Sequence, residues 1–488
     1  MKRTSYFEIY WIDAKGKMLG RYVIQLFQEE NVTFGGRIEE LTQEVRSVNL
    51  TDGIRLRTKV HMSCPSDANP IPLGIYLWSD GRMNRNRFKR HLTCRINGSE
   101  PHHFQMHTGI PVVGQDFVGR ENTFTQIIDI IRSGSCHLSA PRRYGKTSIL
   151  YRIEEVITNT VFVDLCEVRS LNGFMRILIR RLMADPNTHT LLEQIDETRN
   201  WPTTDSSNEA VSEAFKRFDR RGINHGALVQ KMLQVLSEAG FVLLLDEFSI
   251  FLRSMLEDQP QAVGSFLREL KQIRLAGKPL RCIFAGSAGL SAYILFHKLE
   301  GYFDDLTVLE LPPLSTPEAE TLVEELFYGA GKTPSPQVVS RVIECIGAPI
   351  PYFLQTLVHE TVAQIRLEET PEPEDVTRAY LERLLGPTGN IFFRDFLLRE
   401  KAYPKACRTG ASAILHALAE TQGPMAEEDL SVRFNAAVGN TEACNFADLM
   451  TCLQEDYDLI YENNFWVMRS KVLAERWRLG EPWLMGDK

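Results

Sequence analysis

Two patterns of apolar and polar residues divide the chain near Val118. Beyond that point, short apolar segments alternate with longer segments of helical periodicity, which predicts βαβ units on a parallel sheet. Before it, short segments rich in β-forming residues are separated by turn residues, a pattern typical of a small β-rich domain. The predicted strands of the parallel sheet are residues 135–139, 160–165, 241–245, 281–285 and 308–311. Those of the β-rich domain are 5–12, 21–27, 53–62, 73–78 and 88–96, and residues 39–46 are a helix candidate.

The rest of the chain is predicted to be mostly helical. Residues 316–400 read as a series of helices, and a polar stretch at 187–224 predicts a mobile insertion. From 410 to 479, three short helices precede two short strands, which is the outline of a winged helix. Its third helix is predicted at 441–456.

Composition places the chain among ordinary globular proteins. With 488 residues, 43% hydrophobic and 24% charged, it is neither disordered, collagenous nor a coiled-coil rod, and its length suggests about three domains. No apolar run approaches the roughly 20 residues of a membrane span, and the N-terminus lacks the apolar core of a signal peptide. Nine scattered cysteines without a CxxC motif argue against a disulfide framework or a zinc site. We therefore expect a cytoplasmic protein that contacts no membrane.

Charge is distributed unevenly along the chain. Residues 1–108 carry a net charge of +5, and the remaining residues carry −13. Such asymmetry suggests separate roles for the two parts.

A segment that follows the first predicted parallel strand carries the chemistry of a phosphate-binding loop. Ser139-Ala-Pro-Arg-Arg-Tyr-Gly-Lys-Thr-Ser148 leads into a predicted helix and fits the phosphate-loop pattern, with Ala140 in place of the first glycine. In such a loop, backbone N–H groups face the phosphates, Lys146 neutralises phosphate charge, and Thr147 ligates Mg²⁺. The predicted nucleotide-binding residues here are Ala140, Pro141, Arg142, Arg143, Tyr144, Gly145, Lys146, Thr147 and Ser148.

A second element supports this interpretation. The apolar strand that starts at Phe241 ends in Asp246 and Glu247, 100 residues after Lys146. Asp246 would hold Mg²⁺ through water, and Glu247 would polarise the attacking water. Two surface acids after a core strand are common, but together with the loop they predict binding of ATP or a close relative. The next strand ends at Ser287, which either contacts the γ-phosphate or water, or lies in an ordinary turn.

These motifs occur together in an order that resembles a known family. Phe117-Val-Gly-Arg-Glu121, the loop, Leu-Leu-Leu-Asp246-Glu247-Phe, Ala285-Gly-Ser287, Leu314-Ser-Thr-Pro-Glu-Ala319 and Pro351-Tyr-Phe-Leu-Gln355 look like the archaeal-type ATPases of the AAA+/STAND superfamily, in the branch close to origin-recognition initiators. The C-terminal sequence from Leu453 to Trp477 resembles the winged helix of that family. The resemblance covers about 117–479 and leaves 1–108 outside.

The resemblance implies a fold class and a site. It implies an α/β P-loop NTPase core with a helical lid and a C-terminal winged helix, beside the N-terminal β-rich domain. Nucleotide would lie between core and lid, with Phe117, Val118, Gly119 and Arg120 against the adenine and the lid closing near 347–355. The domains are then 1–108, β-rich; 109–314, ATPase core; 315–400, lid; and 401–488, winged helix.

Two departures from the family's pattern bear on hydrolysis. Pro349-Ile350-Pro351 stands where related proteins often have Gly-His-Pro, so no histidine phosphate sensor is expected. Arg268 and Arg274 are only candidates for an arginine finger, so we expect hydrolysis to be slow or activator-dependent.

Two basic or histidine-rich segments have less specific interpretations. The stretch from Arg82 to Arg95 holds six basic residues in fourteen, and it forms either a nucleic-acid-binding strip or, as we favour, a solvated hairpin. His102, His103 and His107 look metal-like at i, i+4 spacing, but no third ligand is adjacent, so we favour linker histidines.

Three functions remain open at this point. We favour an ATP-hydrolysing switch in signalling or defence that couples nucleotide state to a protein partner or to self-assembly through its N-terminal and winged-helix domains. The alternative is a DNA-associated ATPase, an initiator-like or transposition-regulator-like loader, and a third is a nucleotide-locked scaffold. The predicted helix 441–456 has no Lys or Arg and carries Glu442, Asp448, Glu455 and Asp456, so we expect it to contact protein rather than DNA.

Overall fold

The computed structural model divides the chain into two compact units, Met1–His103 and Phe104–Lys488. It describes residues 4–12, 18–27, 33–36, 45–49, 74–79, 82–83, 104–107, 109–198, 201–202, 208–286, 290–366, 369–397, 403–421, 423–439, 444–457 and 459–479. Among the described residues, no helix is both long and apolar enough to cross a membrane.

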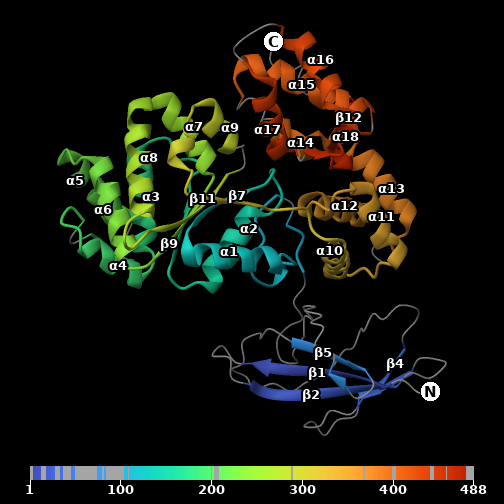
Figure 1. Ribbon diagram of the computed structural model, residues 1–488. Coiled ribbons are helices and arrows are strands. Elements are labelled where there is room, and N and C mark those ends of the chain that lie inside the picture. The colour runs from blue at the N-terminus through green and yellow to red at the C-terminus, as the bar shows by residue number, and fades with distance from the viewer. Residues whose placement is uncertain are drawn as a thin grey trace. The chain divides into compact units, whose positions relative to one another are not determined.

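The first unit is built from antiparallel strands (Figure 1). Its larger sheet has the order β2-β1-β5-β6, with β1 (Thr4–Ile12), β2 (Met18–Phe27), β5 (Gly74–Ser79) and β6 (Arg82–Met83). A separate pair joins β3 (Thr33–Gly36) to β4 (Val45–Asn49). The predicted strands 53–62 and 88–96 lie outside the described residues, as does most of the predicted helix 39–46, whose last two residues belong to β4.

The second unit contains a five-stranded parallel sheet with the order β11-β7-β10-β9-β8. Its strands are β7 (Ser135–Ser139), β8 (Thr160–Asp164), β9 (Val242–Asp246), β10 (Arg281–Ala285) and β11 (Leu306–Glu310). Each lies within two residues of its predicted position. Because ligand sites of open parallel sheets lie at the carboxyl ends of the strands, the loops after β7 and β9 are placed where a site is expected.

Alternate residues of these strands pack into different layers. Leu244 and Ile283 join one apolar cluster, with α1 (Glu121–Ser133) and α2 (Lys146–Val156). Leu243 and Phe284 join the other cluster. The helices of that second layer are α3 (Leu171–Met183), α6 (His225–Glu238), α7 (Phe248–Asp258) and α8 (Pro260–Arg274). The sheet is therefore covered on both faces, as Figure 1 shows.

The predicted insertion at 187–224 is largely helical. It contains α4 (Pro186–Glu193) and α5 (Asn208–Arg220). Trp201 is buried, with its ring 5.0 Å from that of Phe215 and 5.8 Å from that of Phe218. These aromatic contacts attach the segment to the second apolar layer.

Helices follow the sheet, as predicted for 316–400. They are α10 (Thr316–Gly329), α11 (Pro336–Ile346), α12 (Pro351–Gln364), α13 (Pro373–Arg378), a π-helical turn (Ala379–Leu384) and α14 (Asn390–Leu397). Their buried side chains continue the apolar cluster that covers α1 and α2. We call this group of helices the lid helices.

The C-terminal elements form a compact group of helices with a small sheet. They are α15 (Lys405–Thr421), β12 (Met425–Ala426), α16 (Glu427–Val438), α17 (Phe446–Tyr457), β13 (Leu459–Glu462), β14 (Phe465–Met468) and α18 (Lys471–Arg478), with the sheet order β12-β14-β13. The Asn445 side chain caps α17 by accepting from the backbone of Ala447 at 2.8 Å. Leu449 and Leu453 of α17 are fully buried.

Helix packing and hydrogen bonds join these elements to the rest of the second unit. Helix α17 packs against α9 (Leu290–Phe296), and α18 packs against α11. Arg476 of α18 is buried and donates to the backbone oxygen of Leu385 at 2.9 Å. The structure also joins Cys407 to Cys444 in a disulfide, a single pair that the sequence, which argued against a disulfide framework, did not predict.

Candidate functional site

The segment between β7 and α2 forms a tight loop at the carboxyl end of its strand. Gly145 caps α2 with a φ of 93°, and Arg143 also has a left-handed φ of 70°. The left-handed region is accessible to glycine at little cost but strained for arginine. Helix α2 then begins at Lys146, and the first N–H groups of a helix have no intrahelical acceptor. The loop therefore presents the features of an anion site at a helix N-terminus.

The Lys146 side chain lies within this loop. Its ammonium donates to the backbone oxygens of Ala140 at 2.5 Å and Pro141 at 2.9 Å, and the residue is 6% exposed. A buried ammonium attracts anions strongly because little water screens it.

The loop and the end of β9 meet directly. The Thr147 hydroxyl donates to the Asp246 carboxylate at 2.6 Å, although the two residues are 99 positions apart. Lys146 also interacts electrostatically with Asp246. The structure thus brings together three of the residues that the sequence singled out.

Burial, and after it the neighbouring charge of Glu247, raises the pKa of the Asp246 carboxyl to about 6. The Thr147 hydroxyl and the backbone N–H of Glu247, which donates to Asp246 at 3.0 Å, act in the opposite direction. A carboxylate whose negative charge is disfavoured in this way gains from a nearby cation.

Glu247 adopts a left-handed backbone, with a φ of 53°, at the start of α7. It is half-buried beside Asp246. Strain of this kind at a non-glycine residue commonly marks functional sites.

The segment Phe117–Arg120 ends in a buried arginine. The Arg120 guanidinium donates to the backbone oxygens of Tyr144, at 3.1 Å, and Pro312. Its backbone N–H donates to Glu318 of α10 at 2.7 Å. Arg120 is thus held by the loop and by the start of the lid helices, whereas Phe117 and Val118 are partly buried against the first apolar cluster.

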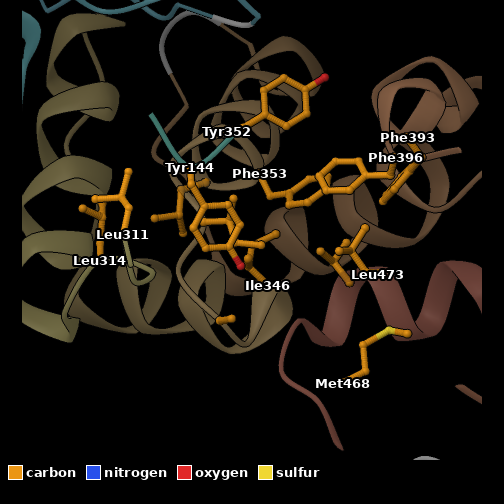
Figure 2. Close-up of a cluster of buried hydrophobic side chains, with 14 of the residues drawn as sticks. Tyr144, Leu311, Leu314, Ile346, Tyr352, Phe353, Phe393, Phe396, Met468 and Leu473 are labelled. Carbon is orange, nitrogen blue, oxygen red and sulfur yellow. The ribbon is translucent and has the colours of Figure 1, made fainter. Parts of the chain in front are cut away.

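Tyr144 links the loop to the lid helices. Figure 2 shows its ring in the apolar cluster with Leu311, Leu314 and Ile346, and it is only 1% exposed. The neighbouring Arg143 guanidinium lies 4.5 Å from the ring centroid of Tyr352 in α12.

The chain before α1 crosses the same region. The Ser148 hydroxyl of α2 accepts from the backbone of Val112 at 2.9 Å. His107 contacts Asp116 at 2.7 Å, and its backbone N–H donates to Gln355 of α12 at 2.8 Å. His107 is therefore engaged in protein contacts, and His102 and His103 lie outside the described residues.

Three other predicted residues have different outcomes. Ser287 lies outside the described residues. Arg274 is ruled out as an arginine finger because its side chain is 1% exposed and bound to Asp305 at 2.8 and 2.9 Å. Arg268 is exposed on α8 and stays a candidate.

Sequence reasoning missed His137, a buried residue of β7. Burial and the Lys146 ammonium lower its pKa to about 4. It also missed the role of Glu318, although the capping motif from Ser315 to Glu318 could have been read from the sequence.

The donor set at Thr147 and Asp246 fits Mg²⁺. A hydroxyl and a carboxylate are hard oxygen ligands, and Mg²⁺ commonly takes only one or two ligands from protein and the rest from phosphates and water. Within the described part of the chain, no group of three or more His, Cys, Asp or Glu residues could hold a metal by itself.

Comparison with known proteins finds similarity at the level of fold. The sequence matches no protein-family model and no curated protein. The structure is similar to the Walker-type ATPase PABY2304 of Pyrococcus abyssi, with a TM-score of 0.54 and 15% identity, over 77% of this chain and all of that one. The second unit therefore shares the fold of a Walker-type ATPase.

Two further matches are weaker. They are the ORC2 protein of Aeropyrum pernix, with a TM-score of 0.36 and 12% identity over 74% of this chain and 94% of that one, and RuvB of Thermotoga maritima, with the same score and identity over 73% and 94%. These scores are too low to bear on the function of this chain.

Proposed function

We propose that this chain binds ATP with Mg²⁺ and hydrolyses it, and that the nucleotide state controls its contacts with other proteins. The observation that carries the proposal is the 2.6 Å contact between Thr147 and Asp246, beside the Lys146 ammonium. A buried ammonium, a helix N-terminus, a hydroxyl and a carboxylate at one point form the set of groups that recognises a Mg²⁺-bound polyphosphate.

Each group has a role in this proposal. The N–H groups at the start of α2 and the Lys146 ammonium bind the β- and γ-phosphates. Thr147 and Asp246 hold Mg²⁺, which supplies charge neutralisation for the phosphates. Glu247 accepts a proton from the attacking water, because it is the half-buried carboxylate adjacent to the metal-binding one. Ser287 is proposed to contact the γ-phosphate or this water.

The proposal extends to the domains. We assign 1–108 to a β-rich partner-binding domain, 109–314 to the ATPase core, 315–400 to the lid and 401–488 to a winged helix. The segment Phe117–Arg120 lies against the adenine, and the chain acts as an AAA+/STAND-type switch in signalling or defence in the cytoplasm. The order of helices and strands from α15 to α18 supports the winged-helix assignment.

A DNA-associated ATPase is the second candidate. The basic stretch from Arg82 to Arg95 favours it, but that stretch is described only at Arg82 and Met83. The packing of α17 against α9 favours the first candidate, because the face of α17 that contacts α9 is not available to a DNA groove.

Substituting Lys146 tests the proposal directly. Lys146→Ala removes the buried ammonium, and a hydrogen bond to a charged group typically contributes about 1.5–3 kcal/mol, so ATP affinity should fall at least about tenfold. Isothermal titration calorimetry with Mg²⁺-ATP measures it, with the exposed Lys278→Ala as the matched control. Unchanged affinity in Lys146→Ala would contradict the assignment of the loop.

A further inference from the structure

Arg120 connects three elements that are far apart in sequence. It is 5% exposed and caps α1 with a left-handed φ of 72°, which is strained for arginine. Its guanidinium binds the backbone oxygens of Tyr144 in the loop and Pro312 at the entrance to the lid helices. These contacts span 24 and 192 positions of the chain.

The contact with Tyr144 fixes the direction of a neighbouring N–H group. The carbonyl of Tyr144 and the N–H of Gly145 belong to one planar trans peptide, so they point in opposite directions. A guanidinium that holds the carbonyl on one side therefore aims the Gly145 N–H away from itself. Gly145 caps α2 at the position where the loop would receive phosphate.

Tyr144 is held from its side chain as well. Its ring is buried in the apolar cluster with Leu311 and Leu314, two residues that flank Pro312 (Figure 2). The same short segment therefore contacts the ring of Tyr144 and, through Arg120, its carbonyl. A shift of this segment must change the orientation of the Tyr144–Gly145 peptide.

The backbone of Arg120 is tied to α10. Its N–H donates to one oxygen of Glu318 at 2.7 Å, and the other oxygen accepts from the backbone of Ser315 at 2.8 Å. Gly119, with a φ of 77°, allows this approach, since an added Cβ would lie 2.9 Å from the Glu318 side chain. Glu318 thus completes the helix cap and holds Arg120 against it.

We propose that Arg120 is a positioning residue that aims the Gly145 N–H at the nucleotide phosphates and couples the phosphate loop to α10. This inference rests on the proposed ATP-binding function. It gives the Arg120 guanidinium a role at the phosphates, while the segment Phe117–Arg120 that carries it lies against the base. Phosphate binding in the loop then stabilises one arrangement of the entrance to the lid helices.

The test compares Arg120→Gln with the exposed Arg132→Gln of the same helix. Competition against a fluorescent ATP analogue measures the affinities for ATP, ADP and AMP, which lacks the β- and γ-phosphates. We expect Arg120→Gln to bind ATP and ADP about tenfold more weakly, because a Gly145 N–H that is no longer aimed at the phosphates loses one charge-assisted hydrogen bond to them. The affinity for AMP should stay within about twofold of wild type. Arg120→Lys, whose ammonium can reach a single carbonyl, should be intermediate, and it serves as the test if Arg120→Gln does not fold.

Hydrogen–deuterium exchange tests the coupling. Addition of ATP should slow exchange in α10 of the wild type and of Arg132→Gln, but not in Arg120→Gln at saturating ATP. Equal ATP affinities of Arg120→Gln and Arg132→Gln would overturn the inference, as would an equal loss for AMP, which would place Arg120 at the base. If the wild type itself does not bind ATP, the proposed function fails first.

Discussion

At the scale of single residues, the candidate site places two carboxylates side by side in different environments. Asp246 is buried and contacts Thr147, whereas Glu247 is half-buried and strained. Such a pair suits two different roles, in which the buried carboxylate binds a cation and the more accessible one accepts a proton.

Glu247→Gln should therefore separate hydrolysis from binding. The amide keeps the shape of the side chain but cannot accept a proton, and general-base assistance is typically worth 10²–10⁴-fold, so we expect turnover to fall by about 10² or more. Phosphate release measures turnover, calorimetry should show retained ATP binding, and Glu257→Gln on α7 is the exposed control. A wild type without turnover under any condition would instead favour the nucleotide-locked scaffold.

The raised pKa of Asp246 also predicts how stability depends on pH. Because its folded-state pKa is about 6 against an ordinary value of 3.8, ionisation opposes folding above pH 6, and this cost disappears as the pH falls towards 3.8. Asp246→Asn should thus stabilise the protein without Mg²⁺ at pH 7.5, by up to roughly 3 kcal/mol, and by about half as much at pH 5.

Urea unfolding of wild type and Asp246→Asn at both pH values checks this. The lowered pKa of His137 acts in the opposite sense, costing stability as the pH falls from 6.5 towards 4, but it is common to both proteins and cancels in the difference. The exposed Asp258→Asn should show no such pH-dependent gain. A lower stability of Asp246→Asn at pH 7.5 would contradict the argument.

At the scale of elements, the strands were predictable where the chain is buried on both sides. β10 has its predicted bounds because its buried side chains form an apolar run, and β7 has them too, although its buried residues include Ser135, His137 and Ser139. β11 begins two residues earlier than predicted, since this edge strand is largely exposed and its apolar run does not mark its ends. Buried parallel strands give a clear apolar signal, and exposed edges do not.

The helix α5 in the insertion could have been predicted from the spacing of its apolar residues. Val211, Ala214, Phe215 and Phe218 are spaced as one face of a helix, and they pack on the second apolar layer. The polar residues around them obscured this stripe. The disulfide and the Arg120 contacts are different, because they depend on how distant segments fold together and no local pattern encodes them.

Some parts of the candidate site could likewise be predicted from local sequence, and others could not. The loop and the strand that ends in Asp246 could be read from local sequence, and the structure brings Thr147 and Asp246 into contact. The residues that hold the loop could not be predicted from local sequence, since Tyr144 and Arg120 make their contacts with segments beyond residue 310.

At the scale of the whole molecule, the question is whether the chain works on DNA or on protein. The structure changes the argument for the C-terminal elements. Asp456 is 2% exposed and accepts from the Tyr403 hydroxyl at 2.5 Å, so this carboxylate is not one of the charges that would repel DNA, contrary to the expectation from the sequence. Instead, α17 is covered in part by α9, and the Phe296 ring of α9 lies 6.3 Å from that of Tyr403.

The basic residues after β14 differ in whether they can reach DNA. Arg476 is buried against the lid helices and cannot reach DNA. We therefore predict that Arg469→Ala with Arg478→Ala leaves any binding of duplex DNA by the full chain unchanged. Loss of each phosphate contact would reduce the slope of log affinity against log salt by about 0.9, so fluorescence anisotropy between 50 and 200 mM salt detects it. A matched double variant in the basic stretch, Arg85→Ala with Arg87→Ala, distinguishes binding through the N-terminal unit. Micromolar, salt-dependent binding that the first double variant abolishes would make the DNA-associated ATPase the better description of this protein.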